Sequence, residues 1–203
     1  MHLGMSGSLQ WLTHAADPGV HDHFDLVTDR GTLRLHDPRR FGAVVWSSGI
    51  DRGVARQRLA GLGAEPFDPA MDDSVFHAAL KLRRAPIKQV LLSGQVIVGA
   101  GNIYACEALY QAGIDPRVAA HRISRARAAR LLTAVRTTLA RAIRAGGTTL
   151  RDFQDAHGAH GAFQHEAQVY GREGLSCERC GGTVRRIVQA QRSTYFCRGC
   201  QSR

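Results

Sequence analysis

The sequence predicts an α+β protein with a β-rich amino-terminal region, a helical middle and a small cysteine-bound β-hairpin at the carboxyl end. Three observations predict this order. Polarity alternates along residues 23–36, apolar residues recur with helical spacing up to residue 143, and four cysteines form two Cys-x-x-Cys pairs after residue 176. With 203 residues, 44% of them hydrophobic, the chain is long enough to bury a core.

The first fifty residues carry the strand signals. Residues 23–29 and 32–36 alternate in polarity around an Arg-Gly turn, which predicts a β-hairpin. The β-branched run at residues 44–46 (VVW) predicts one more strand. Glycines and prolines over residues 61–69 interrupt any periodicity, so we expect a boundary there and helices after it.

Four helices are predicted from capping residues, glycine stops and apolar periodicity. The last of them carries an apolar stripe from Ala128 to Ile143, with arginines over much of its remaining surface. It is therefore expected to pack on one side and to leave the other side cationic. The four predicted helices run from Ser74 to Arg83, from Pro86 to Gly94, from Asn102 to Gly113 and from Ser124 to Gly146.

Charge gives the first indication of function. The chain holds 27 lysines and arginines against 17 acidic residues, a net charge of +10, and every basic residue except Lys81 and Lys88 is arginine. Guanidinium groups bind phosphate in a bidentate manner and stack on bases, which favours a nucleic-acid partner. The alternative is a solvated basic surface in a protein from a GC-rich genome. No segment has the pattern of a membrane helix or a signal peptide, so we expect no membrane partner and a cytoplasmic location.

The cysteines give the strongest local signal. Cys177-x2-Cys180 and Cys197-x2-Cys200 have the spacing of a zinc site in which four thiolates leave no position open for water. We therefore expect one structural Zn2+. Two disulfides are the alternative, which a chain without a signal peptide disfavours. The fifth cysteine, Cys106, is expected to pack in a helix.

Two further segments predict contacts to a nucleic acid. Between the cysteine pairs, two strand-like runs flank a polar tip that includes Arg192, which suits insertion of an arginine into a DNA groove. A glycine-rich junction brings Asn102 to a helix start, where free N–H groups suit a phosphate, and Arg83 and Lys88 precede it. The alternatives are a plain surface arginine and an ordinary turn.

The turn at residues 37–42 (DPRRFG) presents an arginine pair and an aromatic ring. Enzymes that extrude a base must fill the hole left in the stack, and Arg39 and Phe41 are suitable wedges, with Met5 as a third. For Phe41 and Met5, ordinary core packing is the alternative.

Seven short strings in a fixed order resemble the formamidopyrimidine-DNA glycosylase family over nearly the whole chain. The resemblance implies a base-excision repair enzyme, a bifunctional DNA glycosylase and AP lyase that acts on oxidised purines such as 8-oxoguanine and formamidopyrimidines. Its partner is then damaged double-stranded DNA, bound by a monomer at the bacterial nucleoid. The strings are HLGMSG at 2–7, HDH at 21–23, DPRRFG at 37–42, GAGNIYA at 99–105, GGTTL at 146–150, VYGR at 169–172 and AQR at 190–192.

The resemblance also implies a domain order. A remnant of a β-sandwich domain is expected at residues 1–65, and a helical domain with a helix-two-turn-helix motif at 70–153. A lesion-covering loop and linker follow at 154–167, then the zinc finger at 168–203. Within that third segment, residues 157–163 resemble the loop that covers an everted oxidised purine, which favours purines over pyrimidines.

Single residues receive roles from the same resemblance. Met5, Arg39 and Phe41 match the three side chains that replace the flipped nucleotide, and Arg192 matches the proton donor of the final elimination step. Arg83 stands where the family pattern has lysine. The DNA-contacting positions are His21, Arg39, Arg83, Lys88, Asn102 and Arg192.

One part of the family pattern does not occur in the printed sequence. Family members begin with Pro-Glu, whose proline amine attacks the sugar and forms a Schiff base while the glutamate transfers protons. This chain opens with Met-His-Leu, so we expect a truncated, inactive family member. The alternatives are a non-catalytic zinc-containing DNA-binding module and a zinc-ribbon RNA-binding or ribosomal protein. The latter leaves the strings at 37–42 and 99–105 unexplained.

The printed chain is accordingly expected to form no covalent complex with DNA, because the reaction needs an amine beside the anomeric carbon and a carboxylic acid next to it. Incubation with duplex DNA containing 8-oxoguanine in the presence of borohydride measures such trapping. Efficient trapping means that another residue, such as Lys88, acts as the nucleophile, and it contradicts the expectation.

Overall fold

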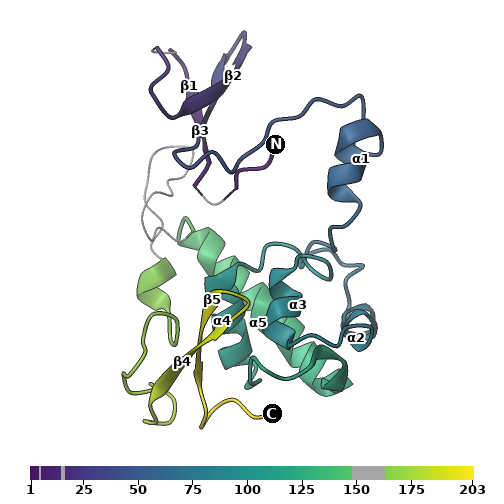
Figure 1. Ribbon diagram of the computed structural model, residues 1–203, viewed down its shortest axis with the longest axis vertical. Helices are drawn as coiled ribbons and strands as arrows, with labels where there is room; N and C mark the ends of the chain where they lie inside the picture. The colour runs from purple at the N-terminus through teal and green to yellow at the C-terminus, as the bar shows by residue number, and fades with distance from the viewer. Residues whose placement is uncertain (5, 15–16, 148–162) are drawn as a thin grey trace. The chain divides into compact units, whose positions relative to one another are not determined.

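The computed structural model describes residues 1–4, 6–14, 17–147 and 163–203. The chain forms two compact units, the first from residues 1–60 and 142–166 and the second from residues 61–141 and 167–203 (Figure 1). The helical segment and the zinc-finger segment, which the sequence places in separate domains, share the second unit.

The first unit contains a three-stranded antiparallel sheet in the order β1-β3-β2. Strands β2 (Asp22–Thr28) and β3 (Gly31–His36) form the predicted hairpin, and β1 (Ser8–Leu12) pairs with the other edge of β3. The strand expected at residues 44–46 is wrong: these residues are in no strand, and Trp46 is 85% exposed. A short apolar run forms a strand only where a neighbouring strand can pair with it. Helix α1 (Gly53–Leu59) was not predicted from the sequence.

Helices α2 (Asp73–Lys81), α3 (Ile87–Leu92), α4 (Asn102–Gln111) and α5 (Arg125–Arg144) build the second unit, as predicted apart from their ends. Helix α2 begins after Asp72, whose carboxylate accepts hydrogen bonds from the backbone N–H groups of Ser74 and Val75 at 2.8 Å. The N-cap residue is therefore Asp72 and not Ser74, which the sequence predicted.

Helix α4 starts and stops at glycines. Gly101 occupies its N-cap position and Asn102 is its first helical residue, a correction of the predicted cap at Asn102. At the other end, Gly113 has a φ of 69° and donates its N–H to the Tyr110 carbonyl oxygen. The Ile114 N–H donates to the Leu109 carbonyl oxygen. This Schellman motif needs a left-handed residue, which glycine supplies without strain.

The core of the second unit lies between these helices and includes Phe76, Leu80 and Leu109. Helix α5 contributes its predicted apolar stripe, with Leu131 0% exposed. Ile143 departs from the prediction, since it is 69% exposed. The α5 residues of this core run only from Ala128 to Leu139, so periodicity alone extended the buried stripe too far.

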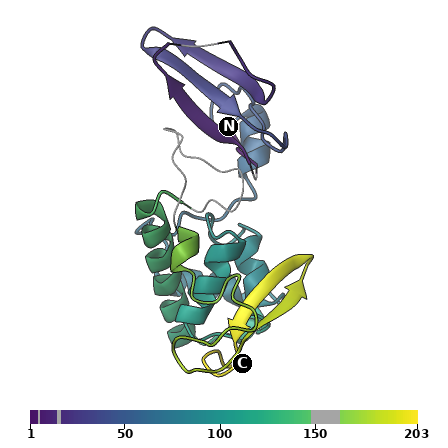
Figure 2. The same ribbon diagram turned by 90° about the vertical axis from the view of Figure 1, so that its left-hand side faces the viewer.

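Strands β4 (Val184–Gln189) and β5 (Arg192–Cys197) form the predicted antiparallel hairpin, seen in Figure 2 beside the helices of the same unit. Its turn consists of Ala190 and Gln191, with φ of 46° and 61°, so Arg192 begins β5 and does not form the tip itself. Two short 3-10 helices complete the described elements, η1 (Ala120–Arg122) and η2 (Phe163–Glu166).

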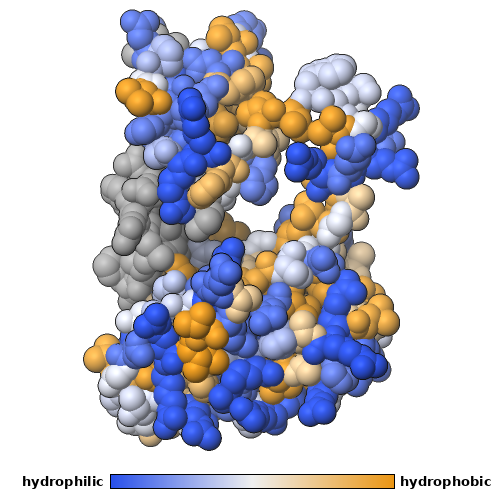
Figure 3. All heavy atoms as spheres, viewed as in Figure 1, coloured by the Kyte–Doolittle hydropathy of each residue, from blue (hydrophilic) through white to orange (hydrophobic). Residues whose placement is uncertain are grey.

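The visible surface in Figure 3 mixes hydrophilic and hydrophobic residues, and many of the hydrophilic ones lie over the second unit. Within the described residues, no helix combines the length and hydropathy that crossing a membrane requires.

Substitution Leu131→Ala is expected to lower the free energy of unfolding by about 2–5 kcal/mol, because it removes buried methyl groups and leaves a cavity. Ile143→Ala on the same helix is the matched control, with an expected change within about 0.5 kcal/mol because the side chain is exposed. Urea unfolding followed by circular dichroism measures both. Equal losses for the two variants would mean that the assigned core of α5 is wrong.

Candidate functional site

The four predicted metal ligands come together at one end of the β4–β5 hairpin. The sulfur atoms of Cys177, Cys180, Cys197 and Cys200 all lie within 4.8 Å of one another. The Cys177–Cys200 and Cys180–Cys197 sulfur pairs are 3.8 and 3.4 Å apart. A tetrahedral zinc with Zn–S bonds of about 2.3 Å has sulfur–sulfur edges of about 3.8 Å. The observed spacing therefore fits one Zn2+ with four thiolate ligands.

Backbone geometry keeps these sulfurs close. After the first cysteine pair, Gly181 adopts a φ of 72° and donates its N–H to the Cys177 carbonyl oxygen at 2.8 Å. In the second pair, a Cβ at Gly199 would lie 3.1 Å from the Cys180 sulfur, tighter than side chains normally pack. Glycine at these two positions leaves room for both turns to approach one centre.

Within the cluster, the pKa values of the thiols are shifted in opposite directions. Burial raises the pKa of Cys177, but hydrogen bonds from the Tyr110 hydroxyl and from backbone N–H groups outweigh it and lower the pKa to about 6. Burial and the neighbouring sulfurs raise the pKa of Cys197 and Cys200. Four thiolates at this distance repel one another, and a divalent cation removes that repulsion.

A second cluster lies where β5 meets helices α3 and α4. The Ser193 carbonyl oxygen accepts hydrogen bonds from Lys88 Nζ at 2.9 Å and from Asn102 Nδ2 at 3.1 Å, and Ser193 follows Arg192 directly. The structure thus brings the predicted pair Lys88 and Asn102 next to the strand that carries Arg192, which was predicted from another segment. Their surroundings differ: Arg192 is exposed, Asn102 is half-buried and Lys88 is fully buried.

Two residues that the sequence analysis missed support this cluster. The buried carboxylate of Glu107 on α4 accepts the backbone N–H groups of Gln168, Val169 and Tyr170 at 2.8–2.9 Å. The Tyr170 hydroxyl in turn lies 3.4 Å from Asn102 Nδ2. An acidic residue in an otherwise apolar stretch of helix is the signal that could have found Glu107, because a buried carboxylate needs hydrogen-bond donors.

In the first unit, the turn at residues 37–42 is fixed by the buried carboxylate of Asp37. It accepts hydrogen bonds from the Ser6 hydroxyl and the Gly42 N–H, both at 2.7 Å, and these bonds lower its pKa although burial raises it. The turn presents Arg39 and Phe41 to solvent, with the guanidinium carbon 5.7 Å from the ring centroid. Phe41 is 60% exposed, so core packing does not explain it.

The other predicted site residues lie apart from these clusters. His21 is exposed and its ring contacts that of His36 edge-on, with centroids 5.8 Å apart. Arg83 is half-buried just after α2, and no hydrogen bond joins it to Asn102 or Arg192. Met5 and residues 157–162 of the predicted lesion-covering loop lie outside the described residues.

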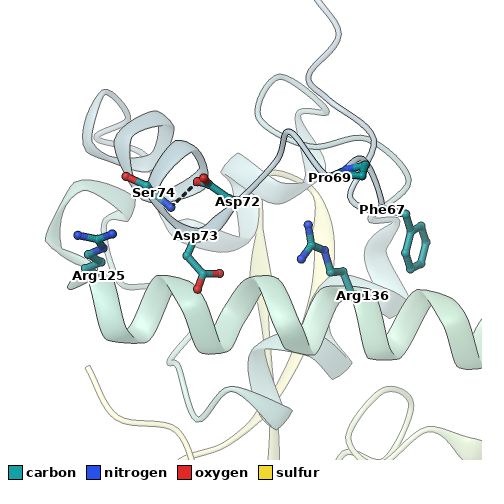
Figure 4. Close-up of a pocket in the computed structure, with 7 residues that line it drawn as sticks. All are labelled: Phe67, Pro69, Asp72, Asp73, Ser74, Arg125 and Arg136. Atoms are coloured by element: carbon teal, nitrogen blue, oxygen red, sulfur yellow. Dashed lines mark hydrogen bonds between the residues drawn. The ribbon is translucent and has the colours of Figure 1, made fainter.

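A cavity of about 610 Å³ lies between α5 and the start of α2, and no predicted site residue lines it. Figure 4 shows Asp73 pointing toward α5 between Arg125 and Arg136, with Phe67 at the far side. The Arg136 guanidinium donates hydrogen bonds to the carbonyl oxygens of Pro66 and Met71 at 2.6 and 2.7 Å. Arg136 therefore serves to hold the loop before α2 onto α5.

These features define the class of protein: a zinc-finger protein whose four-cysteine hairpin is fastened to a helical domain, with a sheet domain before it. Three family models match the chain. They are the formamidopyrimidine-DNA glycosylase N-terminal domain over residues 1–44, the H2TH domain of the same glycosylase over 62–154, and the zinc finger found in FPG and IleRS over 174–203.

Curated relatives and solved structures agree with these matches. The formamidopyrimidine-DNA glycosylases of an Acidovorax species and of Variovorax paradoxus are 57% and 58% identical over 201 residues, which is 99% of this chain and 74% of each relative. The crystal structure of the MutM (Fpg) protein from Thermus thermophilus superposes with a TM-score of 0.84 at 39% identity, covering 98% of this chain and 73% of that one. The chain belongs to the formamidopyrimidine-DNA glycosylase family.

The family match bears on two expectations. The zinc-finger match and the four-cysteine geometry confirm the predicted structural Zn2+ site. The match of residues 1–44 to the amino-terminal domain confirms the family of the β-rich region. The expected loss of activity through truncation is tested by neither, and it stays a prediction.

One zinc ion per chain is expected, bound by all four thiolates. Cys177→Ser combined with Cys197→Ser should abolish zinc binding and lower the melting temperature, since the hairpin loses its cross-link. Cys106→Ala, which removes the cysteine outside the cluster, is the control and should retain zinc. Elemental analysis of purified protein gives the ratio, and a value near zero for the unmodified chain would refute the site.

Proposed function

We propose that this protein binds damaged duplex DNA and acts in base excision repair as a DNA glycosylase and AP lyase for oxidised purines. The observation that carries the proposal is that Asn102 is hydrogen-bonded to the Ser193 carbonyl oxygen, directly after the exposed Arg192 on the zinc-finger hairpin. Solved relatives give support: Lactococcus lactis Fpg binds DNA with an abasic site, and MutM binds DNA with carbocyclic 8-oxo-G. These two are 32% and 33% identical to this chain, with TM-scores of 0.84 and 0.85, and each alignment covers all of this chain and 73% of theirs.

Phosphate binding is assigned to the second unit. Helix α4 begins at Asn102 with backbone N–H groups that have no carbonyl partner within the helix, and the positive end of the helix dipole adds to their attraction for an anion. Arg192 contributes an exposed guanidinium from the adjacent strand. In the same proposal, Arg192 donates the proton of the final elimination step.

Base extrusion is assigned to the turn at residues 37–42. An extruded base leaves a hole in the stack, and an exposed aromatic ring with a guanidinium beside it is suited to fill that hole. The Asp37 carboxylate fixes the turn, so Arg39 and Phe41 keep their orientation before DNA arrives. Met5 is proposed as the third wedge, and His21 and Arg83 as further phosphate contacts.

A second candidate function is a DNA-binding module without catalysis. The observation behind it is that the residues assigned to DNA above bind phosphate or fill the base stack, and none of them supplies an amine nucleophile. Borohydride trapping on 8-oxoguanine duplexes distinguishes the two functions, since only a catalytic chain forms the Schiff base. We further propose a monomer in the bacterial cytoplasm that associates with the nucleoid through DNA, which light scattering and cell fractionation test.

Arg192→Gln is expected to weaken binding to abasic-site DNA by roughly 1–3 kcal/mol, the scale of a charge-assisted contact. The logarithmic salt slope should also fall by about 0.9, because one phosphate contact fewer releases fewer counterions. Arg198→Gln, which removes an exposed arginine next to β5, is the matched control and should bind nearly normally. Fluorescence anisotropy at several salt concentrations measures both.

Asn102→Ala should weaken binding over the same range but leave the salt slope unchanged, because no charge is lost. Unchanged affinity in both Arg192→Gln and Asn102→Ala would refute the assignment of this cluster to DNA.

A further inference from the structure

Lys88 on α3 has a charged group without access to water. Its side chain is 0% exposed, and Nζ donates hydrogen bonds to the Ser193 carbonyl oxygen at 2.9 Å and the Thr194 hydroxyl at 2.7 Å. Burial lowers the pKa of Lys88. A buried ammonium group is costly unless polar atoms surround it, and an apolar side chain of similar length commonly fills such a position at no loss of stability. The two hydrogen bonds to β5 indicate what this buried group does in the fold.

The contacts of Lys88 lie on the strand that carries Arg192. Asn102 Nδ2 donates to the same Ser193 carbonyl oxygen. Polar atoms of α3 and α4 thus hold the first part of β5 directly after Arg192.

The two-residue turn before this strand has an uncommon backbone conformation. Ala190 and Gln191 both have positive φ, a left-handed conformation that costs free energy for residues with a Cβ. Backbone in this conformation persists only where its surroundings fix it. The hydrogen bonds from Lys88 to Ser193 and Thr194 fix the backbone on the β5 side of this turn.

We propose that Lys88 is a positioning residue: its buried ammonium group anchors the start of β5 and so sets the place where the Arg192 guanidinium meets DNA. Lys88 then acts through Arg192 and does not touch a phosphate itself. A direct contact would require Nζ to leave two hydrogen bonds and a site without solvent access. The inference rests on the proposed function, because it takes Arg192 to bind DNA.

A double-mutant cycle of Lys88→Met and Arg192→Gln tests this coupling in the full chain. The probe is duplex DNA that carries a tetrahydrofuran abasic-site analogue, and dissociation constants are measured at four salt concentrations. Lys88→Met alone should weaken binding about tenfold, a coupling of ordinary size for residues that are linked through shared hydrogen-bonded neighbours. In the Arg192→Gln background, it should weaken binding less than twofold and leave the salt slope unchanged.

Other outcomes overturn the proposal. A direct phosphate contact by Lys88 predicts the same loss in both backgrounds and a further fall of about 0.9 in the salt slope of the double variant. Normal binding by Lys88→Met overturns it as well. If Arg192→Gln alone binds normally, the assignment of Arg192 to DNA fails, and this inference fails with it.

Two variants guard against a trivial loss of structure. Lys81→Met removes the other lysine, whose Nζ bonds to the His121 carbonyl oxygen at an exposed site, and should leave binding unchanged in both backgrounds. If Lys88→Met lacks zinc or fails to fold, Thr194→Val takes its place, because it removes one acceptor of Lys88 and keeps the charge. Thr194→Val should weaken binding about threefold alone and not at all with Arg192→Gln. Equal losses in both backgrounds overturn the proposal.

Discussion

The zinc finger is too small to be stabilised by its own apolar contacts, and the arrangement of the second unit follows from this constraint. Its buried cluster includes Cys177, Val184 and Cys197 together with Cys106 and Tyr110 of α4. Two of these finger residues are metal ligands, so the metal and the neighbouring helix substitute for a core. Helix α4 is therefore the common support of the hairpin and of the residues proposed to contact DNA.

Each turn of α4 holds a different part of the finger. Asn102 bonds to the β5 backbone, Glu107 holds the backbone N–H groups of residues 168–170, and the Tyr110 hydroxyl contacts the Cys177 sulfur. Arg179 covers the Tyr110 ring, with its guanidinium carbon 4.4 Å from the ring centroid. Because these contacts are polar and directional, they fix the orientation of the hairpin in a way that apolar packing does not.

The sequence predicted the parts of this site but not their connections. The cysteine spacing predicted the metal centre because ligand spacing within a Cys-x-x-Cys turn is a local property. Periodicity found the helices, but it extended the buried stripe of α5 to Ile143, and an apolar run suggested a strand at residues 44–46. Both errors have one cause: burial depends on which neighbour an element finds, which no local pattern contains.

The sequence by itself therefore determined the family and the zinc ligands. It also predicted Asn102 and Arg192 as DNA contacts and the turn at residues 37–42 as the source of the wedge residues. Only the tertiary structure decided the surroundings of each side chain. It buried Lys88 against Ser193 and Thr194, and it exposed Phe41 above a turn held by Asp37. The physical reason is sequence distance: Lys88 and Ser193 are more than a hundred residues apart, and their hydrogen bond exists only once α3, α4 and β5 have packed.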